Sequence, residues 1–235
     1  MGNVVGIHQP NFMPWLGYFY KIWQSDVFIF LDDVQFQKTG ASYTNRVSIN
    51  INGQSSYLTI PIKRDSGVSS INEVKFLNEK WKKKVIGSLQ ANYGKSKFFK
   101  ENKDFIFELV NFSSDNLAEY NINFIKHISH KLEIDTLFVK SSEFDISSTS
   151  TQRLIALIKK VEGTVYLSGS GGDNYQEHRL YADEKIELIY NKMPKFEYHQ
   201  IKTDEFIGGL SILDAIFNIG FDVLTQSLFQ KKTNV

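Results

Sequence analysis

A strand, a loop, a helix and a second strand follow one another at the start of the chain, and this order leaves few folds open. The apolar run Val4–Ile7 stops at His8-Gln9-Pro10, which is typical of a buried strand that ends in a loop. Helical spacing begins near Trp15 and breaks at Ser25-Asp26, and a second apolar run covers Val27–Leu31. Two buried strands joined by one helix within about 27 residues predict a βαβ unit, with a parallel strand pair and a right-handed crossover.

The middle of the chain has different periodicities. Alternating segments at Tyr43–Ile49 and Tyr57–Ile62 flank a turn at Asn50–Gly53, which predicts an antiparallel hairpin. Helical spacing follows and predicts a helical subdomain over about 79–133. Its candidate helices are 79–92, 98–112 and 115–132. We expect Asp115 to cap the last of them.

A second α/β stretch completes the chain. The polar segment Ser147–Ser150 can cap a helix over 151–161, and an amphipathic helix over 211–219 is expected to stop at Gly220. Candidate strands are Thr136–Val139, Thr164–Leu167 and Glu187–Tyr190. We therefore expect an α/β fold in one domain, 1–235, with a parallel central sheet, an antiparallel hairpin insertion and the helical subdomain.

The composition excludes several classes of function. The 235 residues include no cysteine, which excludes disulfides, cysteine-based zinc sites and a cysteine nucleophile. The net charge of +1 gives no overall basic footprint for nucleic acid. No signal-peptide pattern and no apolar run of about 18 residues occurs, so we expect a cytoplasmic protein without a transmembrane segment. No H-E-x-x-H motif is present, and we expect no resident metal site.

The loop after the first strand is the strongest candidate site, because open α/β sheets bind ligands at the carboxyl ends of their strands. His8 could act as a general base or acid, or bind a phosphate. The candidate substrate-binding residues beside it are Gln9, Asn11, Trp15, Gly17 and Tyr18. Trp15 and Tyr18 could stack on a base or a sugar ring. The alternative is that His8 and Gln9 only satisfy backbone groups at the strand end, while the aromatic residues belong to the core.

An acidic pair, Asp32-Asp33, follows the second strand, and a parallel pairing brings it to the same sheet edge as His8. One carboxylate could be catalytic, orient His8, bind a ligand hydroxyl or amine, or help to hold Mg²⁺. Successive side chains of a strand point to opposite faces, so at most one should enter a cleft. Lys38, Asn45 and Arg46 follow as candidate ligand contacts, with Lys38 and Arg46 suited to phosphate. The alternative is a solvated strand end.

A glycine-rich segment, Ser168–Tyr175, follows a predicted strand. Its consecutive N–H groups could form a nest for an anion. The candidate residues are Ser168, Gly169, Gly171, Gly172 and Tyr175. The segment lacks the P-loop pattern, and an ordinary loop is equally compatible with it. Separately, nine lysines against two acids in 75–103 indicate either a solvated helix face or a surface for nucleotide, RNA or anionic membrane.

The sequence resembles the WbqC-like family over nearly its whole length. The N-terminal segments that carry the resemblance are His8-Gln9-Pro10, Pro14–Tyr18, Lys21-Ile22, Asp26, Leu31–Phe36 and Asn45-Arg46. The later ones are Leu58–Ile62, Tyr166–Gly169, Tyr175 and Ser211–Gly220. The resemblance implies a role in bacterial O-antigen and lipopolysaccharide biosynthesis, and some members are named glycine transferases. The N-terminal unit also resembles nucleotidyltransferases and class I synthetases of the HIGH superfamily, although it has one His where their HxGH signature has two.

Three functions are compatible with these features. The preferred one is transfer of an amino acid (glycine) or an acyl group to the amine of a nucleotide-linked amino sugar, with aminoacyl-tRNA as one conceivable donor. The second is an ATP-dependent, amino-acid-activating ligase or nucleotidyltransferase, for which Mg²⁺ and ATP would be the cofactors. The third is a non-catalytic binding protein of the glycan-assembly machinery. The sequence gives no cofactor for the first function and no oligomeric state.

Overall fold

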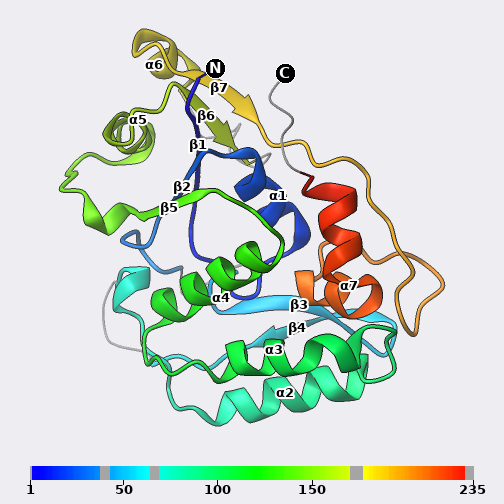
Figure 1. Cartoon of the computed structure of the whole chain (residues 1–235). Helices are drawn as coiled ribbons and strands as arrows, with labels where there is room; N and C mark the ends of the chain where they lie inside the picture. Colours follow the sequence, from blue (N-terminus) through cyan, green and yellow to red (C-terminus); the bar gives the residue numbers. More distant parts are fainter. Residues whose placement is uncertain (1, 38–42, 64–68, 170–176, 231–235) are drawn as a thin grey trace.

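The central element of the fold is a five-stranded parallel sheet with the strand order β5-β2-β1-β6-β7 (Figure 1). The computed structural model describes residues 2–37, 43–63, 69–169 and 177–230. The strands of this sheet are β1 (Val4–His8), β2 (Val27–Phe30), β5 (Leu137–Lys140), β6 (Val165–Ser168) and β7 (Glu187–Tyr190). β1 pairs in parallel with β2 and with β6. The predicted βαβ unit and the α/β fold class are confirmed.

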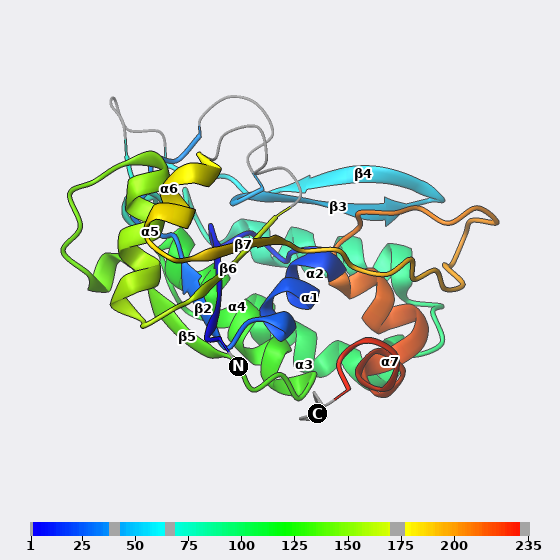
Figure 2. The same cartoon turned by 90° about the horizontal axis from the view of Figure 1, so that it is seen from above.

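Helices cover both faces of the sheet because its strands are apolar on both sides. Phe28 and Phe30 join the larger core with α1 (Leu16–Gln24) and α7 (Ile212–Leu228). Ile7 and Ile29 join a second core on the opposite face, with α5 (Ser150–Lys160) and α6 (His178–Asp183). Figure 2 shows α5 and α6 on one side of the strands, and α1, α4 and α7 on the other. The fold thus has three layers at the sheet.

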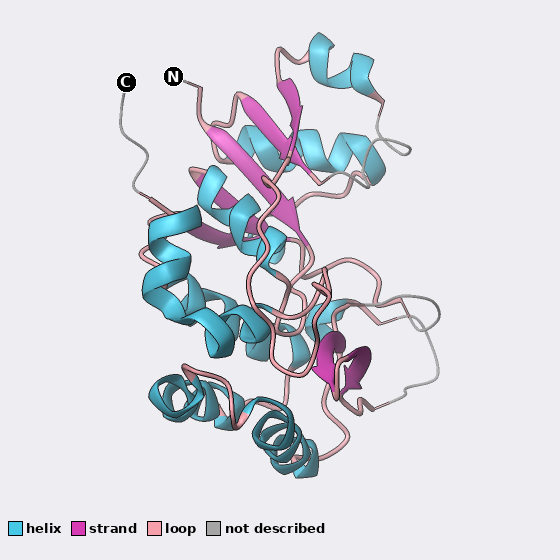
Figure 3. Ribbon diagram, turned by 90° about the vertical axis from the view of Figure 1, so that its right-hand side faces the viewer, coloured by secondary structure: helices cyan, strands magenta, loops and turns pink. Residues whose placement is uncertain are grey.

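The hairpin forms a separate two-stranded sheet of β3 (Arg46–Ile51) and β4 (Gln54–Thr59), as predicted (Figure 3). Its tight turn is Asn52-Gly53, where both residues have positive φ, and Asn-Gly is the pair that such two-residue turns prefer. The hairpin is anchored to the helical region, because the Tyr93 hydroxyl accepts a 2.9 Å hydrogen bond from the Asn50 N–H. Short 3-10 turns occur at η1 (Ile71–Glu73) and η2 (Ser141–Glu143).

The three predicted helices of the middle region are present as α2 (Lys80–Tyr93), α3 (Phe99–Asn111) and α4 (Leu117–Lys131). The predicted cap of α4 was wrong by one residue. Asn116 is the N-cap, and its Oδ1 accepts a 2.9 Å hydrogen bond from the Glu119 N–H. The Asp115 carboxylate is instead 2.9 Å from the Lys75 ammonium, a partner that lies 40 residues away and that no local pattern indicates.

The end of the last helix also differs from the prediction. Gly220 does not stop α7; it has φ 82° and ψ 166° and introduces a kink, after which the helix continues to Leu228. A Cβ at Gly220 would lie 2.9 Å from the Phe98 ring, so both the backbone conformation and the packing require glycine here. None of the described helices is both long enough and apolar enough to cross a membrane.

Candidate functional site

The strand order places three of the candidate segments at one sheet edge. The chain runs from β1 outward to β2 and β5, and it then continues on the other side of β1 with β6 and β7. β1 and β6 therefore flank the point where the strand order reverses, which is where open parallel sheets bind ligands, beyond the carboxyl ends of the strands. His8 ends β1, Ser168 ends β6, and Asp32 follows β2.

His8 has a defined tautomer at this edge. Its Nδ1 is 3.0 Å from the Gln9 carbonyl oxygen, and because a carbonyl can only accept, Nδ1 must carry the proton. Nε2 is then the hydrogen-bond acceptor of the ring. The rings of Tyr18 and Trp15 meet the imidazole edge-on, with centroids 4.9 and 6.1 Å away. His8 is therefore oriented like a base that receives a proton through Nε2.

Two nearby basic groups have lowered pKa values. Burial, and secondarily the charge of Lys21, lower the pKa of His8 to about 4. Lys21 is itself only 3% exposed, and this burial lowers its pKa to about 7. Its ammonium donates a 2.7 Å hydrogen bond to the Ile7 carbonyl. His8 is thus neutral at pH 7, which argues against binding a phosphate as a cation and leaves Nε2 unprotonated. We did not predict a role for Lys21, although a lysine within an apolar helical stripe was a signal.

The stability of the protein should decrease as the pH falls from 7 to 5. The unfolded chain protonates His8 near 6.5 and the folded chain near 4, so between these values the unfolded state binds more protons and the free energy of unfolding rises with pH. The difference is at most about 2 kcal/mol at pH 5. Urea denaturation at the two pH values checks this expectation. Between pH 7 and pH 5, the His8→Gln variant should lose about 2 kcal/mol less stability than the wild type. Equal losses in the two proteins would contradict the assignment of this pH dependence to His8.

The loop that carries His8 is fixed by buried side chains. Tyr18 is 2% exposed, and its hydroxyl donates a 2.9 Å hydrogen bond to the Gln9 carbonyl. Asn121 of α4, which is fully buried, donates through Nδ2 to the carbonyls of Pro10, at 2.9 Å, and Thr44, at 2.7 Å. Tyr18 therefore supports the loop from beneath and offers no free ring face to a ligand. We did not predict Asn121, because its partners lie 111 and 77 residues away.

The acidic pair is divided between two environments. Asp32 accepts hydrogen bonds from the Ser142 hydroxyl at 2.8 Å and the Ser142 N–H at 3.0 Å. Asp33 forms a 2.5 Å ion pair with Arg153 of α5. The Ser141 hydroxyl lies 3.1 Å from Asp32 Oδ1 and 2.5 Å from Asp33 Oδ1. The carboxylates thus bind η2 and α5 to the sheet edge, and among the described residues neither hydrogen-bonds to His8.

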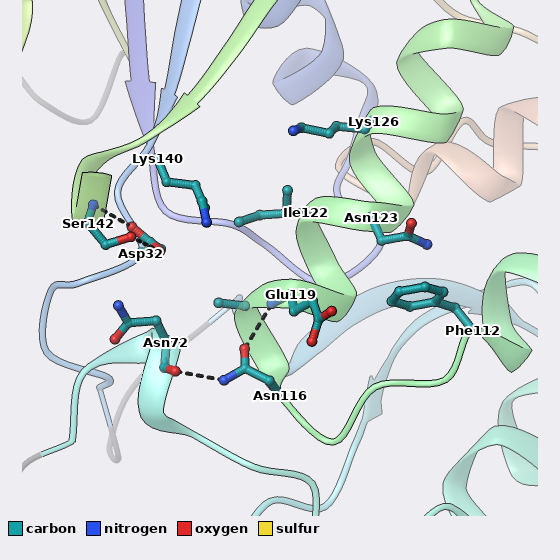
Figure 4. A pocket seen from close by; sticks show the side chains of 11 residues that line it. Asp32, Asn72, Phe112, Asn116, Glu119, Ile122, Asn123, Lys126, Lys140 and Ser142 are labelled. Carbon is teal, nitrogen blue, oxygen red and sulfur yellow. Dashed lines mark hydrogen bonds between the residues drawn. The ribbon is translucent and has the colours of Figure 1, made fainter. Parts of the chain in front are cut away.

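A cleft of about 440 Å³ opens beside this acidic pair (Figure 4). It lies between the carboxyl ends of β2 and β5 and one face of α4. Asp32 lines it and Asp33 does not. The other polar or charged lining residues are Asn72, Asn116, Glu119, Asn123, Lys126, Lys140 and Ser142. Its charged and amide groups come from segments far apart in sequence.

An aromatic hollow of about 240 Å³ lies at the start of α1. Trp15 and Gly17 line it together with residues 193–198 and 206–210. Its rings include Phe196, Tyr198 and Phe206. Trp15 lines this hollow, and its ring centroid is also 6.1 Å from that of His8. A planar base or a sugar ring bound in the hollow would therefore lie next to the His8 loop.

The remaining candidate residues contact groups outside the two hollows described above. Asn45 donates to the Ile60 carbonyl at 3.2 Å, and the Arg46 guanidinium lies 4.5 Å from the centre of the Tyr57 ring. Asn11 is buried at 3% exposure. Ser168 donates to the Gly169 carbonyl, and a side chain at Gly169 would meet open space. The candidates outside the described residues are Lys38, Gly171, Gly172 and Tyr175.

Seven of the nine lysines of 75–103 are exposed, in α2, in α3 and in the segments beside these helices. Lys82 is buried and pairs with Glu79 at 2.5 Å. In the described part of the chain, no group of three or more His, Asp or Glu side chains is arranged to hold a metal ion.

Comparison with known proteins identifies the family of the chain. The chain matches the model of the WbqC-like protein family over residues 9–226. It is similar to the uncharacterized protein Rv1507c of Mycobacterium tuberculosis, with 27% identity over 218 residues, which are 92% of this chain and 94% of that protein. No solved structure matches it. The family match covers the βαβ unit from Gln9 on, the hairpin, α2–α4, the second α/β stretch and most of α7, and the chain therefore belongs to the WbqC-like protein family.

Proposed function

We propose that this protein is an enzyme of bacterial surface-glycan (O-antigen) biosynthesis that transfers an amino acid, such as glycine, or an acyl group to the amine of a nucleotide-linked amino sugar. The main supporting observation is the orientation of His8: its proton is on Nδ1, and Nε2 is the acceptor, at the edge where the strand order reverses. We place the reaction in the cytoplasm, where nucleotide-linked sugars are made.

The reaction requires one proton acceptor. The sugar amine attacks the activated carbonyl, a C–N bond forms, and the bond to the leaving group breaks with its electron pair. The amine proton, which becomes strongly acidic on attack, passes to His8 Nε2. Lys21 assists by its own titration, because loss of its proton near pH 7 removes the charge that disfavours an imidazolium at His8.

The aromatic hollow supports the choice of acceptor. Trp15, Phe196 and Phe206 offer ring surfaces within a volume of about 240 Å³, which suits a nucleobase or one sugar ring. Arg46, Lys38 and the Gly169–Gly172 segment are the groups that we assign to the diphosphate. Asp32 then contributes indirectly, by holding η2 at the sheet edge through Ser142.

Ligand-induced stabilisation tests the proposal directly. Thermal denaturation is measured with nucleotide-linked amino sugars, with UDP and dTDP as matched controls that lack the sugar, and with ATP and Mg²⁺-ATP. A ligand at 100 times its Kd should add about 2.7 kcal/mol to the free energy of unfolding. We expect the largest shift with an amino-sugar nucleotide. Stabilisation by Mg²⁺-ATP alone, together with magnesium-dependent release of pyrophosphate, would instead support the amino-acid-activating ligase.

A further inference from the structure

The cleft between β5 and α4 has features that the proposed transfer at His8 does not use. It opens at the carboxyl ends of β2 and β5, on the far side of β2 from β6. Its volume of about 440 Å³ is within the range of small-molecule sites. Apolar lining comes from Phe112, Ala118 and Ile122, while the remaining lining residues are polar or charged. An apolar wall with convergent polar groups is the usual composition of a ligand site.

Two ammonium groups from different elements meet at this cleft. Lys140 is the last residue of β5, and Lys126 lies in the middle of α4. Figure 4 shows both side chains directed toward the cleft. Lys140 forms only a 3.5 Å pair with Glu143, in which both side chains are about half exposed. Within the described chain, Lys126 has no carboxylate within ion-pair distance. The Lys126 ammonium also lies 5.9 Å from the centre of the Phe138 ring. This contact is weaker than a close ion pair, so both ammonium groups can still donate to an anion.

Within the described residues, neither acid of the cleft forms an ion pair with Lys126 or Lys140. The Asp32 carboxylate is satisfied by the hydroxyl and N–H groups of η2. Glu119 accepts a 2.7 Å hydrogen bond from the Ser114 hydroxyl. In Figure 4 its carboxylate lies beside Asn116 and away from Lys126. Glu119 thus lies apart from the ammonium groups, whereas Asp32 lies on the β5 side, where the hydroxyl and N–H groups of η2 hold its carboxylate.

Amide groups supply hydrogen-bond donors near the ammonium groups. Asn72 Oδ1 accepts from the Ser70 hydroxyl at 2.6 Å, which leaves its NH₂ group as the side-chain donor. Asn123 also lines the cleft and precedes Lys126 by three residues on α4, but in Figure 4 its amide points toward Phe112, opposite to the Lys126 ammonium. The Asn72 amide and the two ammonium groups, which line the same cleft, are donors that suit an oxygen-rich anion.

We propose that this cleft is a binding site for a phosphate-bearing small molecule, whose phosphate lies between Lys126 and Lys140. A doubly charged group matches two ammonium groups better than a carboxylate does. The volume leaves room for the rest of the ligand, which contacts Phe112 and Ile122. The inference is independent of the reaction proposed for His8, because it assigns a second site with its own ligand chemistry.

Calorimetric titration with inorganic pyrophosphate at fixed ionic strength tests this site. The Lys126→Met/Lys140→Met double variant should weaken binding by about 10-fold or more, since two charge-assisted contacts are lost. The matched control is Lys131→Met/Lys160→Met, which removes the same charge from exposed positions on α4 and α5 and should bind as wild type does. Thermal denaturation of each variant verifies that it is folded.

Three outcomes would overturn the proposal. Equal weakening in both double variants would show that only net charge matters. Undiminished binding of pyrophosphate to the cleft variant would place its site elsewhere. If the wild type does not bind pyrophosphate at millimolar concentration, the cleft is not such a site. Acetate at the same ionic strength should bind more weakly than pyrophosphate. The His8→Gln variant should retain pyrophosphate binding, so that failure of this site and failure of the proposed transfer are separate results.

Discussion

Replacing His8 by Ala should lower the turnover number by about 10²–10⁴-fold, the usual contribution of a general acid or base. The reason is geometric: the Gln9 carbonyl fixes the proton on Nδ1, so Nε2 is the acceptor at the sheet edge. KM should change much less, because the proposed binding surfaces for ring and diphosphate lie on other residues. Steady-state kinetics of amide formation with the nucleotide-linked amino sugar found by thermal denaturation measures both constants.

Two further variants make this result specific. His130→Ala removes a histidine from an exposed position on α4 and should leave turnover unchanged. His8→Gln retains polarity and much of the volume without a titrating group, so it should be nearly as slow as His8→Ala. Added imidazole should partly restore the rate of His8→Ala. A turnover number for His8→Ala equal to that of wild type would remove His8 from the mechanism.

Replacing Arg153 by Met should lower the free energy of unfolding by about 2–4 kcal/mol. This is less than the full cost of breaking a buried ion pair, because the pair of Arg153 with Asp33 is partly exposed. The side chains of Arg153 and Asp33 are 16% and 23% exposed. The substitution leaves the Asp33 carboxylate without its cation and also removes the 2.8 Å hydrogen bond from Arg153 to the Ile146 carbonyl. Urea denaturation with a constant m-value measures the loss.

The matched control is Arg179→Met, where the arginine is 91% exposed and lies 3.8 Å from Asp183. Such a surface pair contributes about 0–1 kcal/mol, so this variant should remain close to wild type. The double variant Asp33→Asn/Arg153→Met should recover part of the stability, because no unpaired carboxylate remains. Equal stability of Arg153→Met and Arg179→Met would contradict a structural role for the Asp33–Arg153 pair.

The main elements could be predicted because their signals are local. The βαβ unit follows from two apolar runs and one helical stripe, and the hairpin follows from alternation around Asn52-Gly53. Helices α2–α4 appear within two residues of their predicted ends. Gly220 shows the limit of such signals. A glycine usually ends a helix, but here the Phe98 ring fills the space beside it and tertiary packing lets helical structure resume.

The sequence by itself determined the parallel sheet and the loop at its edge, because hydrophobic periodicity and turn residues act over a few positions. Only the tertiary structure decided what the side chains of that edge do. Asp32 and Asp33 have partners 108 to 120 residues away, and Asn121 reaches the His8 loop from α4. Burial likewise lowers the pKa of Lys21 to about 7. Such contacts and desolvation exist only after the chain has folded, since they depend on which distant segments meet.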